Sequence, residues 1–323
     1  IRAGTQGGKA ALPARMAKGI YIHGSGHNIV LNDKKAFQEH PEWFAEVMGK
    51  RTMDQICWNN SEVEDVMFEK FVKQLDKYPE YALFGFYPED NQNYCRCAKC
   101  RKTDVSTNWF RFLRRLTDRL HAKYPHLRFT SIAYQGYLDY PKCDMDGYAF
   151  IEFAPYARCF VHDISHQCAP NKYALEVWSP WLRSGIPTGV YGYEFDILSP
   201  SMMIPVYHWL SDQARLFRKN NVQAVIPEIP GTYASKWGHA RIDMRLAFYL
   251  YSRLMWDPDA DVNALIRDFC NYVYPSAADE MYAYHTMMDR AWSSQKQDFS
   301  GYFSSPITAS AEFITPERIA RTF

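Results

Sequence analysis

The sequence predicts an α/β protein, specifically a (β/α)8 TIM-type barrel that lacks its first strands and has extra C-terminal helices. Three observations favour this fold. Short β-rich segments alternate with segments of helical periodicity up to about residue 240, only helical patterns follow, and no glycine-rich phosphate loop follows a strand. Strands that alternate with helices pair in parallel through right-handed crossovers. A doubly wound open sheet is the alternative fold, but it has no G-x-G-x-x-G or P-loop motif to support it here.

Six segments have the composition expected of strands. A closed barrel has eight, so two βα units are expected to precede Ile1, and the start without Met indicates part of a longer or processed polypeptide. A long polar segment is expected between the first strand and residue 60. The predicted strands are residues 19–23, 82–87, 128–134, 148–153, 188–193 and 223–227.

Seven segments show apolar residues at helical spacing. Ser61 is predicted to cap the first helix, because Glu64 follows three residues later as in a capping box. The barrel is expected to span residues 1–260, and the helical extension residues 261–323. The predicted helices are residues 61–75, 109–120, 173–183, 206–219, 242–255, 262–272 and 277–292.

The charge balance excludes two classes of partner. The 323 residues carry a net charge of +1, whereas proteins that grip nucleic acid or an anionic membrane carry a basic excess. No apolar run reaches the roughly 18 residues of a membrane-spanning segment. Aromatic residues make up 16% of the chain, which favours a large core over a sugar-stacking cleft when composition is considered alone.

Carboxylates follow three of the predicted strands, at the end where a barrel carries its chemistry. Asp90 follows the strand at 82–87, Glu194 follows 188–193, and Glu228 follows 223–227. Glycoside hydrolysis needs an acid that protonates the leaving oxygen and a second group that stabilises or attacks the oxocarbenium-like centre. We therefore predict these three residues as catalytic. The alternative is that they cap helices or pair with Lys and Arg.

A C-x-C-x-x-C array follows the loop that carries Asp90. Cys95, Cys97 and Cys100 have the short spacing with which thiolates converge on one zinc ion, given a fourth ligand. A disulfide to a second loop, or reduced thiols, are the alternatives. In each case the cluster is expected to hold the acid loop rather than to catalyse, since no catalytic cysteine signature is present. The candidates for the fourth ligand are Cys159, His162, His166 and Cys168.

Several segments in one order resemble the catalytic domain of glycoside hydrolase family 163. They include H-P-E-W-F at 40–44, Y-C-x-C-x-x-C at 94–100 and W-D-P-D at 256–259, and the resemblance extends from about residue 40 to about residue 274. It implies a (β/α)8-barrel endo-β-N-acetylglucosaminidase of the kind with which bacteria break down complex N-glycans. It also implies a secreted, periplasmic or cell-surface protein with a glycan or glycoprotein substrate and no cofactor needed for catalysis.

The resemblance also implies a set of site residues. Asp90, assisted by Asn91, would orient the 2-acetamido group of the substrate, whose carbonyl oxygen acts as the internal nucleophile of a retaining reaction. Glu228 would be the acid, with Glu194 as its rival. Two departures from the family pattern are Glu89, where an amide is usual, and the segment 191–194. Further positions that match, or are expected to bind substrate, are Glu89, Tyr94, Tyr134, His162, Asn171 and Tyr193.

Two other functions remain open from the residues alone. An exo-acting glycosidase or uronidase on polysaccharide would keep the fold, and a uronic acid would favour a cation near the strand ends, for which Arg158 and Lys236 are available. A non-catalytic glycan-binding barrel would bind glycans without cleaving them.

Overall fold

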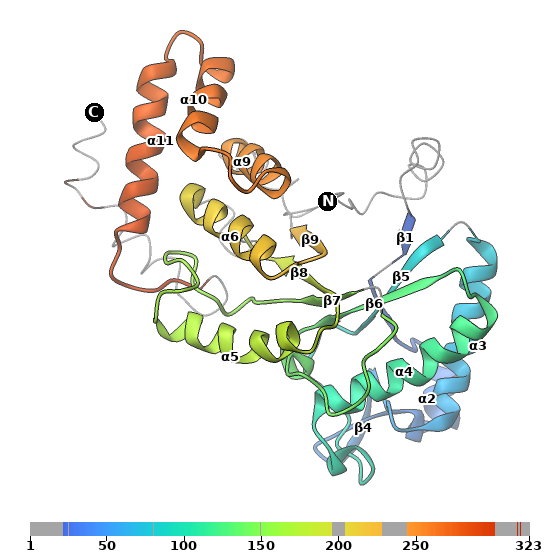
Figure 1. The fold of residues 1–323 in the computed structure, drawn as a ribbon. Helices are drawn as coiled ribbons and strands as arrows, with labels where there is room; N and C mark the ends of the chain where they lie inside the picture. Colours follow the sequence, from blue (N-terminus) through green and yellow to red (C-terminus); the bar gives the residue numbers. More distant parts are fainter. Residues whose placement is uncertain are drawn as a thin grey trace. The chain divides into compact units, whose positions relative to one another are not determined.

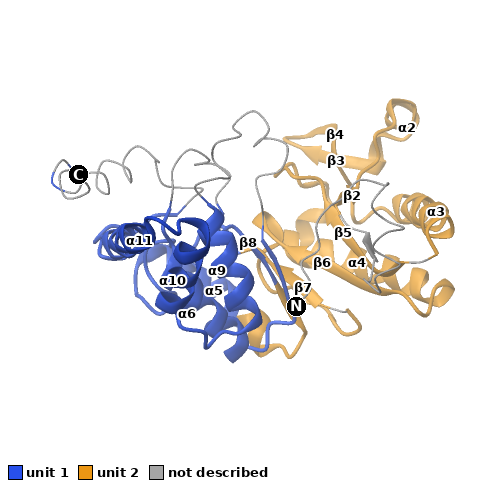
Figure 2. Cartoon of the chain, turned by 90° about the horizontal axis from the view of Figure 1, so that it is seen from above, with its two compact units in different colours: residues 1, 155–179, 190–323 blue, residues 2–154, 180–189 orange. Residues whose placement is uncertain are grey.

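The computed structural model describes residues 22–24, 26–79, 81–148, 150–195, 204–227 and 244–300, with residues 315 and 317 (Figure 1). It divides into two compact units, shown in orange and blue in Figure 2. Unit 2 contains residues 2–154 and 180–189, and unit 1 contains residues 155–179 and 190–323.

Among the described residues, the main sheet has six parallel strands along its path and a short seventh strand off it, which confirms the α/β prediction. Residues 19–21 of the first predicted strand lie outside the described residues. The order of the six strands in the sheet follows their order in the chain. A doubly wound sheet instead reverses its strand order at a switch point, so that alternative is not what the described strands form. A short strand, β2 (His27–Ile29), also pairs with β5. The strand order is β1 (Ile22–Gly24), β5 (Tyr81–Pro88), β6 (Arg128–Ala133), β7 (Phe150–Phe153), β8 (Thr188–Gly192) and β9 (Ala224–Pro227).

The two faces of β5 have different neighbours, because side chains alternate along a strand. Phe84 and Phe86 pack against Phe71 of α3 (Ser61–Lys77), with ring centroids 5.8 and 4.8 Å apart. Tyr87 therefore lies on the opposite face of β5. Phe86 pairs with Ser131 of β6 and Ile132 pairs with Glu152 of β7, so the C-terminal ends of these three strands lie level.

A β-hairpin occupies part of the segment that we expected to be polar and irregular. Strands β3 (Phe44–Val47) and β4 (Lys50–Ile56) form a two-stranded antiparallel sheet. Met48 and Gly49 at the turn have φ values of +50° and +79°, as a two-residue type I′ turn requires. The sequence pattern missed β4 because most of its side chains are polar and only its last two residues are buried.

Asn60, rather than Ser61, caps α3. Its Oδ1 accepts hydrogen bonds from the backbone N–H groups of Glu62 at 2.9 Å and Val63 at 3.3 Å. The predicted capping box is therefore wrong by one residue, and Glu64 is not part of it.

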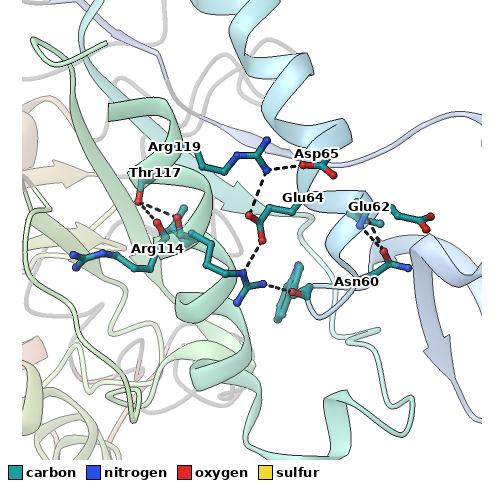
Figure 3. Close-up of polar contacts among 11 residues, drawn as sticks. Asn60, Glu62, Glu64, Asp65, Arg114, Thr117 and Arg119 are labelled. Atoms are coloured by element: carbon teal, nitrogen blue, oxygen red, sulfur yellow. Dashed lines mark hydrogen bonds and ion pairs between the residues drawn. The ribbon is translucent and has the colours of Figure 1, made fainter. Parts of the chain in front are cut away.

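Glu64 instead joins α3 to α4 (Val105–Lys123), as Figure 3 shows. Its Oε2 accepts from Arg115 at 2.6 Å, and its Oε1 accepts from Arg119 at 3.4 Å. The Glu64 side chain is only 12% exposed, so this small network is more shielded from water than a typical surface ion pair.

The predicted helices are confirmed, with boundaries shifted by a few residues. In unit 1, α6 packs against α9, and α10 packs against both α9 and α11. These helices lie on both sides of residue 260, and the predicted division there stays a prediction. The remaining helices are α2 (Lys34–Glu39), α5 (Ala169–Arg183), α6 (Tyr207–Lys219), α9 (Arg245–Trp256), α10 (Val262–Val273) and α11 (Ala278–Ser293), with short 3-10 turns at η2 (Pro41–Trp43), η3 (Cys100–Lys102) and η4 (Gln135–Tyr137).

Much of the aromatic content lies in the core, as the composition favoured. The largest fully buried side chains include those of Trp109, Trp178, Trp181 and Trp292. Among the described helices, none is both long and apolar enough to cross a lipid bilayer.

Candidate active site

A buried carboxyl group lies near the C-terminal end of the sheet in unit 2. Glu152 is the penultimate residue of β7, and its exposed fraction is 0%. Tyr87 is the penultimate residue of β5, and its hydroxyl oxygen lies 2.8 Å from Glu152 Oε1 and 2.7 Å from Oε2. The tyrosine thus spans β6 to reach the acid, and together the two side chains form a hydrogen-bonded pair at the level of the strand ends.

The environment of Glu152 favours its protonated form. Burial raises the pKa of the Glu152 carboxyl to about 7, because the charged form loses its hydration inside the protein, while the hydrogen bond from Tyr87 opposes part of this effect. A carboxyl with a pKa near 7 holds a proton on about half of the molecules at neutral pH. Such a group can donate its proton to a leaving oxygen and take it back.

A second carboxylate, Asp90, lies on the loop that follows β5. It is exposed, and its Oδ1 accepts a hydrogen bond of 3.3 Å from Nε2 of Gln135, which directly follows the end of β6. The Tyr94 hydroxyl donates to Gln135 Oε1 at 3.3 Å and accepts from the Gly136 N–H at 3.3 Å. Gln135 thus links the acid loop to the loop of the next strand.

The backbone at this link has a special conformation. Gln135 has a φ of +47°, which non-glycine residues seldom adopt. A Cβ at position 136 would lie 2.4 Å from a Tyr94 ring carbon, so Gly136 is what allows the ring to approach. Residues held in sparsely populated backbone regions often lie at ligand-binding sites.

The rest of the acid loop is held by amide side chains. Gln55 of β4 donates to the carbonyl oxygens of Glu89 at 2.7 Å and Asn91 at 3.4 Å. The Asn91 side chain accepts from the N–H of Asn93 at 3.0 Å and donates to the carbonyl of Asp54 at 3.0 Å. These bonds place the Asn91 amide in the framework of the loop, and its predicted contact with substrate stays a prediction.

A fourth cysteine lies close to the C-x-C-x-x-C array of Cys95, Cys97 and Cys100. Cys57, directly after β4, lies with Cys95, Cys97 and Cys100, and the four sulfur atoms are within 4.8 Å of one another. Cys57 is thus a fourth candidate ligand in addition to those considered at 159–168. All eight cysteines are free thiols, so the disulfide alternative is not what the structure contains.

The group at 159–168 forms a separate cluster in unit 1. Cys159, His162 and Cys168 lie within 4.8 Å of one another. The Nε2 of His162 is 3.0 Å from the carbonyl oxygen of Gln295 and its Nδ1 is 3.5 Å from the Cys159 sulfur. The His162 ring also stacks on His166, with centroids 4.1 Å apart. His162 is therefore engaged within this cluster, and its predicted role in substrate binding stays a prediction.

Glu194 is buried in unit 1, two residues after the end of β8. Burial raises the pKa of its carboxyl, and its Oε2 has no hydrogen-bond partner among the described residues. A Cβ at Gly192 would lie 2.0 Å from that oxygen, so the carboxyl group occupies the space that the missing side chain leaves. Arg158 is close enough for its charge to oppose the rise in the Glu194 pKa.

Arg158 is itself an unusual residue. It is 3% exposed, its guanidinium stacks on the Trp209 ring at 4.4 Å, and Nη1 donates to Gln213. Its Nε and Nη2 have no partner among the described residues. Burial lowers the pKa of Arg158 to about 10, an effect that the negative charge of Glu194 opposes.

Comparison with known families places most of the chain in one of them. Residues 6–286 match the model of a domain of unknown function, DUF4838. The chain belongs to the DUF4838 family. No match is found among curated proteins. The region of the DUF4838 match contains Glu152, Asp90, Glu194 and both clusters of cysteine residues described above.

The predicted site residues of this DUF4838 domain fall in different parts of the structure. Asp90 and Tyr134 belong to unit 2, whereas Glu194 and Tyr193 belong to unit 1. Tyr134 and Tyr193 are both buried, 6% and 7% exposed. Glu228 lies outside the described residues, as does Lys236. The convergence of the three predicted carboxylates on one site therefore stays a prediction.

Two candidate site residues of the DUF4838 domain were not found from the sequence. Glu152 lies inside the apolar strand at 150–153, where a lone glutamate is a signal because an unpaired charge is costly to bury. Cys57 follows a strand and lies 38 positions before Cys95 in the chain. Its separation from the array hides it from any local motif.

Proposed function

We propose that this chain is a glycoside hydrolase that cleaves β-linked N-acetylglucosamine in glycans, by a retaining and substrate-assisted reaction of the endo type. The observation that carries the proposal is the Glu152–Tyr87 pair. Glu152 lies near the C-terminal ends of parallel strands, and its pKa of about 7 leaves it partly protonated at neutral pH, as a general acid for glycoside cleavage needs to be.

In this proposal Glu152 protonates the leaving glycosidic oxygen. The hydroxyl of Tyr87, at 2.7 and 2.8 Å, holds the orientation of the carboxyl group and stabilises the carboxylate that forms when the proton leaves. Burial then favours the return of a proton from water, so that the same group acts as base and is reset. Glu228, expected to be the acid on the basis of the family resemblance, becomes the competing assignment, with Glu194 as the third.

Asp90 is assigned to the 2-acetamido group. Its carboxyl group is exposed and is held through Oδ1 by the neutral amide of Gln135, which leaves lone pairs for a ligand. A carboxylate that accepts from the acetamido N–H turns the acetamido oxygen toward the anomeric carbon and stabilises the positive charge that develops on the amide.

The strand order supports the finer fold assignment. Along the path of the main sheet, each of the six strands neighbours the next of the six in chain order, as in a (β/α)8 barrel. We propose that these strands belong to such a barrel. A glycan-degrading role would also place the protein outside the cell or in the periplasm.

The test compares aryl and alkyl N-acetylglucosaminides as substrates. Removal of a general acid lowers the rate of cleavage strongly when the leaving group is poor. It lowers the rate much less when the leaving group is an activated aryl group, which needs no proton. We expect Glu152→Gln to lower kcat/KM for an alkyl or glycan substrate by 100-fold or more, and for a dinitrophenyl glycoside much less. Asp90→Asn should lower both similarly.

Controls make the assignment decisive. Asp118→Asn, at an exposed ion pair on α4, should leave both rates unchanged. Glu228→Gln and Glu194→Gln are measured in parallel, and whichever variant shows the leaving-group dependence identifies the acid. Unaltered turnover by Glu152→Gln would remove Glu152 from the chemistry. Glycan binding without cleavage by the wild-type protein would replace the hydrolase proposal with a binding module.

A uronidase is the second candidate function, and Arg158 favours it. Its Nε and Nη2 atoms, which have no partner among the described residues, could hold the carboxylate of a uronic acid, because planar guanidinium groups bind carboxylates through paired hydrogen bonds. Product profiling with N-glycoproteins and uronic-acid polymers, offered separately, distinguishes the two substrates. If only the polymers are cleaved, the N-acetylglucosaminidase assignment is wrong.

A further inference from the structure

The four buried thiols of unit 2 have the separations of a metal site. Cys57 Sγ lies 3.7 Å from Cys100 Sγ and 3.9 Å from Cys97 Sγ, and Cys95 completes a group within 4.8 Å. Zinc–sulfur bonds of about 2.3 Å in a tetrahedron place the sulfur atoms about 3.8 Å apart. A disulfide would need about 2.05 Å, roughly half the distances observed.

Hydrogen-bond donors surround the sulfur atoms. The backbone N–H of Glu46 donates to Cys95 Sγ at 3.3 Å, and Asn59 Nδ2 donates to Cys100 Sγ at 3.4 Å. The guanidinium of Arg51 also approaches Cys95 Sγ, at 3.8 Å. Neutral thiols are weak acceptors, whereas thiolates attract such donors. A zinc ion with four thiolates carries a net charge of −2, and the positive charge of Arg51 offsets part of it.

We propose that Cys57, Cys95, Cys97 and Cys100 bind one zinc ion as a closed structural site. Each thiol releases its proton to solvent as its zinc–sulfur bond forms. Four protein ligands fill the tetrahedron of a structural zinc site, which leaves no open coordination position for a substrate, and all four side chains are 2–7% exposed. Four sulfur ligands favour zinc or iron over magnesium or calcium, and zinc needs no redox partner.

The zinc ion would fasten the acid loop to the β3–β4 hairpin. Cys57 directly follows β4, and the other three ligands lie in the connection of residues 89–104 between β5 and α4. That connection contains only one short 3-10 turn, and long irregular connections need such ties to hold one conformation. A backbone hydrogen bond from Arg96 N to Glu46 O, at 2.7 Å, runs beside the proposed metal site. This inference concerns metal binding and does not depend on the glycosidase proposal.

Metal content is the first test. The protein is incubated with zinc chloride and freed of loosely bound metal. Its zinc content per chain is then measured by inductively coupled plasma mass spectrometry. Compared with wild type, Cys57→Ser and Cys97→Ser should each lose about one zinc per chain, whereas Cys270→Ser, at a buried cysteine in α10, should lose none. An unchanged zinc content in both cluster variants overturns the proposal. So does loss of zinc from Cys168→Ser with retention in Cys57→Ser, which would assign the metal to the cluster in unit 1.

A second test uses the intact wild-type protein, so that it does not rely on a variant that folds. Native alkylation with iodoacetamide is mapped by peptide mass spectrometry, before and after a zinc chelator is added to the zinc-loaded chain. We expect the chelator to raise the labelling rate of the four cysteines at least tenfold and to leave half-buried Cys143 unchanged. Equal labelling with and without the chelator means that the four are simply buried thiols, and overturns the proposal.

Discussion

The hydroxyl oxygen of Tyr87 lies within 2.8 Å of both carboxyl oxygens of Glu152, although the two residues are 65 positions apart in the chain. One phenolic proton can serve only one of these oxygens at a time. When Glu152 is protonated, its own O–H can donate back to the phenolic oxygen, so the pair is satisfied in either protonation state. This exchange allows a carboxyl group to be fully buried and still gain or lose a proton.

The stability of the protein should depend on pH through Glu152. Its pKa is about 7 when folded, against an ordinary value of 4.5, so the folded state binds more protons between these values. The contribution to stability is complete below about pH 4.5 and is lost as the pH rises through 7, a change of about 3 kcal/mol. We expect the Glu152→Gln variant not to lose this stability as the pH rises, because its amide does not titrate.

Urea unfolding of wild type and Glu152→Gln at pH 5.5 and pH 8.5 measures the effect. The free energy of unfolding of wild type, relative to the variant, should fall by about 2 kcal/mol between the two pH values. The difference between the proteins isolates this group from other titrating residues. Parallel pH dependences would show that Glu152 does not titrate with a raised pKa.

A double-mutant cycle tests the contact between Gly192 and Glu194. An added Cβ at position 192 would lie 2.0 Å from Glu194 Oε2, so Gly192→Ala must displace the carboxyl group, and we expect a loss of about 1–3 kcal/mol of stability. In a Glu194→Ala background the same substitution should cost at least 1 kcal/mol less. Additive losses in thermal or urea unfolding would mean that the two positions do not interact.

The N-terminal end of α3 offers a matched pair of variants, at Asn60 and Ser61. Asn60→Ala removes the side-chain oxygen that accepts two backbone N–H groups and should cost about 1 kcal/mol. Ser61→Ala, at the first helical residue, should change the free energy of unfolding by less than about 0.5 kcal/mol. A larger loss from Ser61→Ala than from Asn60→Ala would return the cap to the residue that the sequence pattern indicated.

The link between α3 and α4 should be sensitive to charge. Glu64→Gln keeps the shape of the side chain but removes the charge that faces Arg119 (Figure 3) and Arg115, and we expect a loss of about 1 kcal/mol at low salt. The loss should shrink at 1 M salt, because the side chains of Arg115 and Arg119 are 44% and 37% exposed and salt screens charges that reach solvent. Glu69→Gln, on the same helix, serves as the control. A loss that does not depend on salt would point to packing instead of charge.

Local patterns predicted most of the helices and strands. On α4, the residues Trp109, Leu113, Leu116 and Leu120 recur at helical spacing, and all four are buried in the structure. This succeeded because the period of a helix is a property of neighbouring residues. The hairpin β3–β4 escaped the same approach because much of β4 is polar and its pairing partner decides its conformation.

The sequence by itself determined the alternation of strands and helices, the carboxylate at Asp90 and three of the four clustered thiols. Only the tertiary structure brought Cys57 to within 3.7 Å of Cys100, and Glu152 to the hydroxyl of Tyr87. Contacts between residues 43 and 65 positions apart depend on how strands and loops are laid side by side. That arrangement follows from the burial of many side chains at once, which no single segment of the sequence encodes.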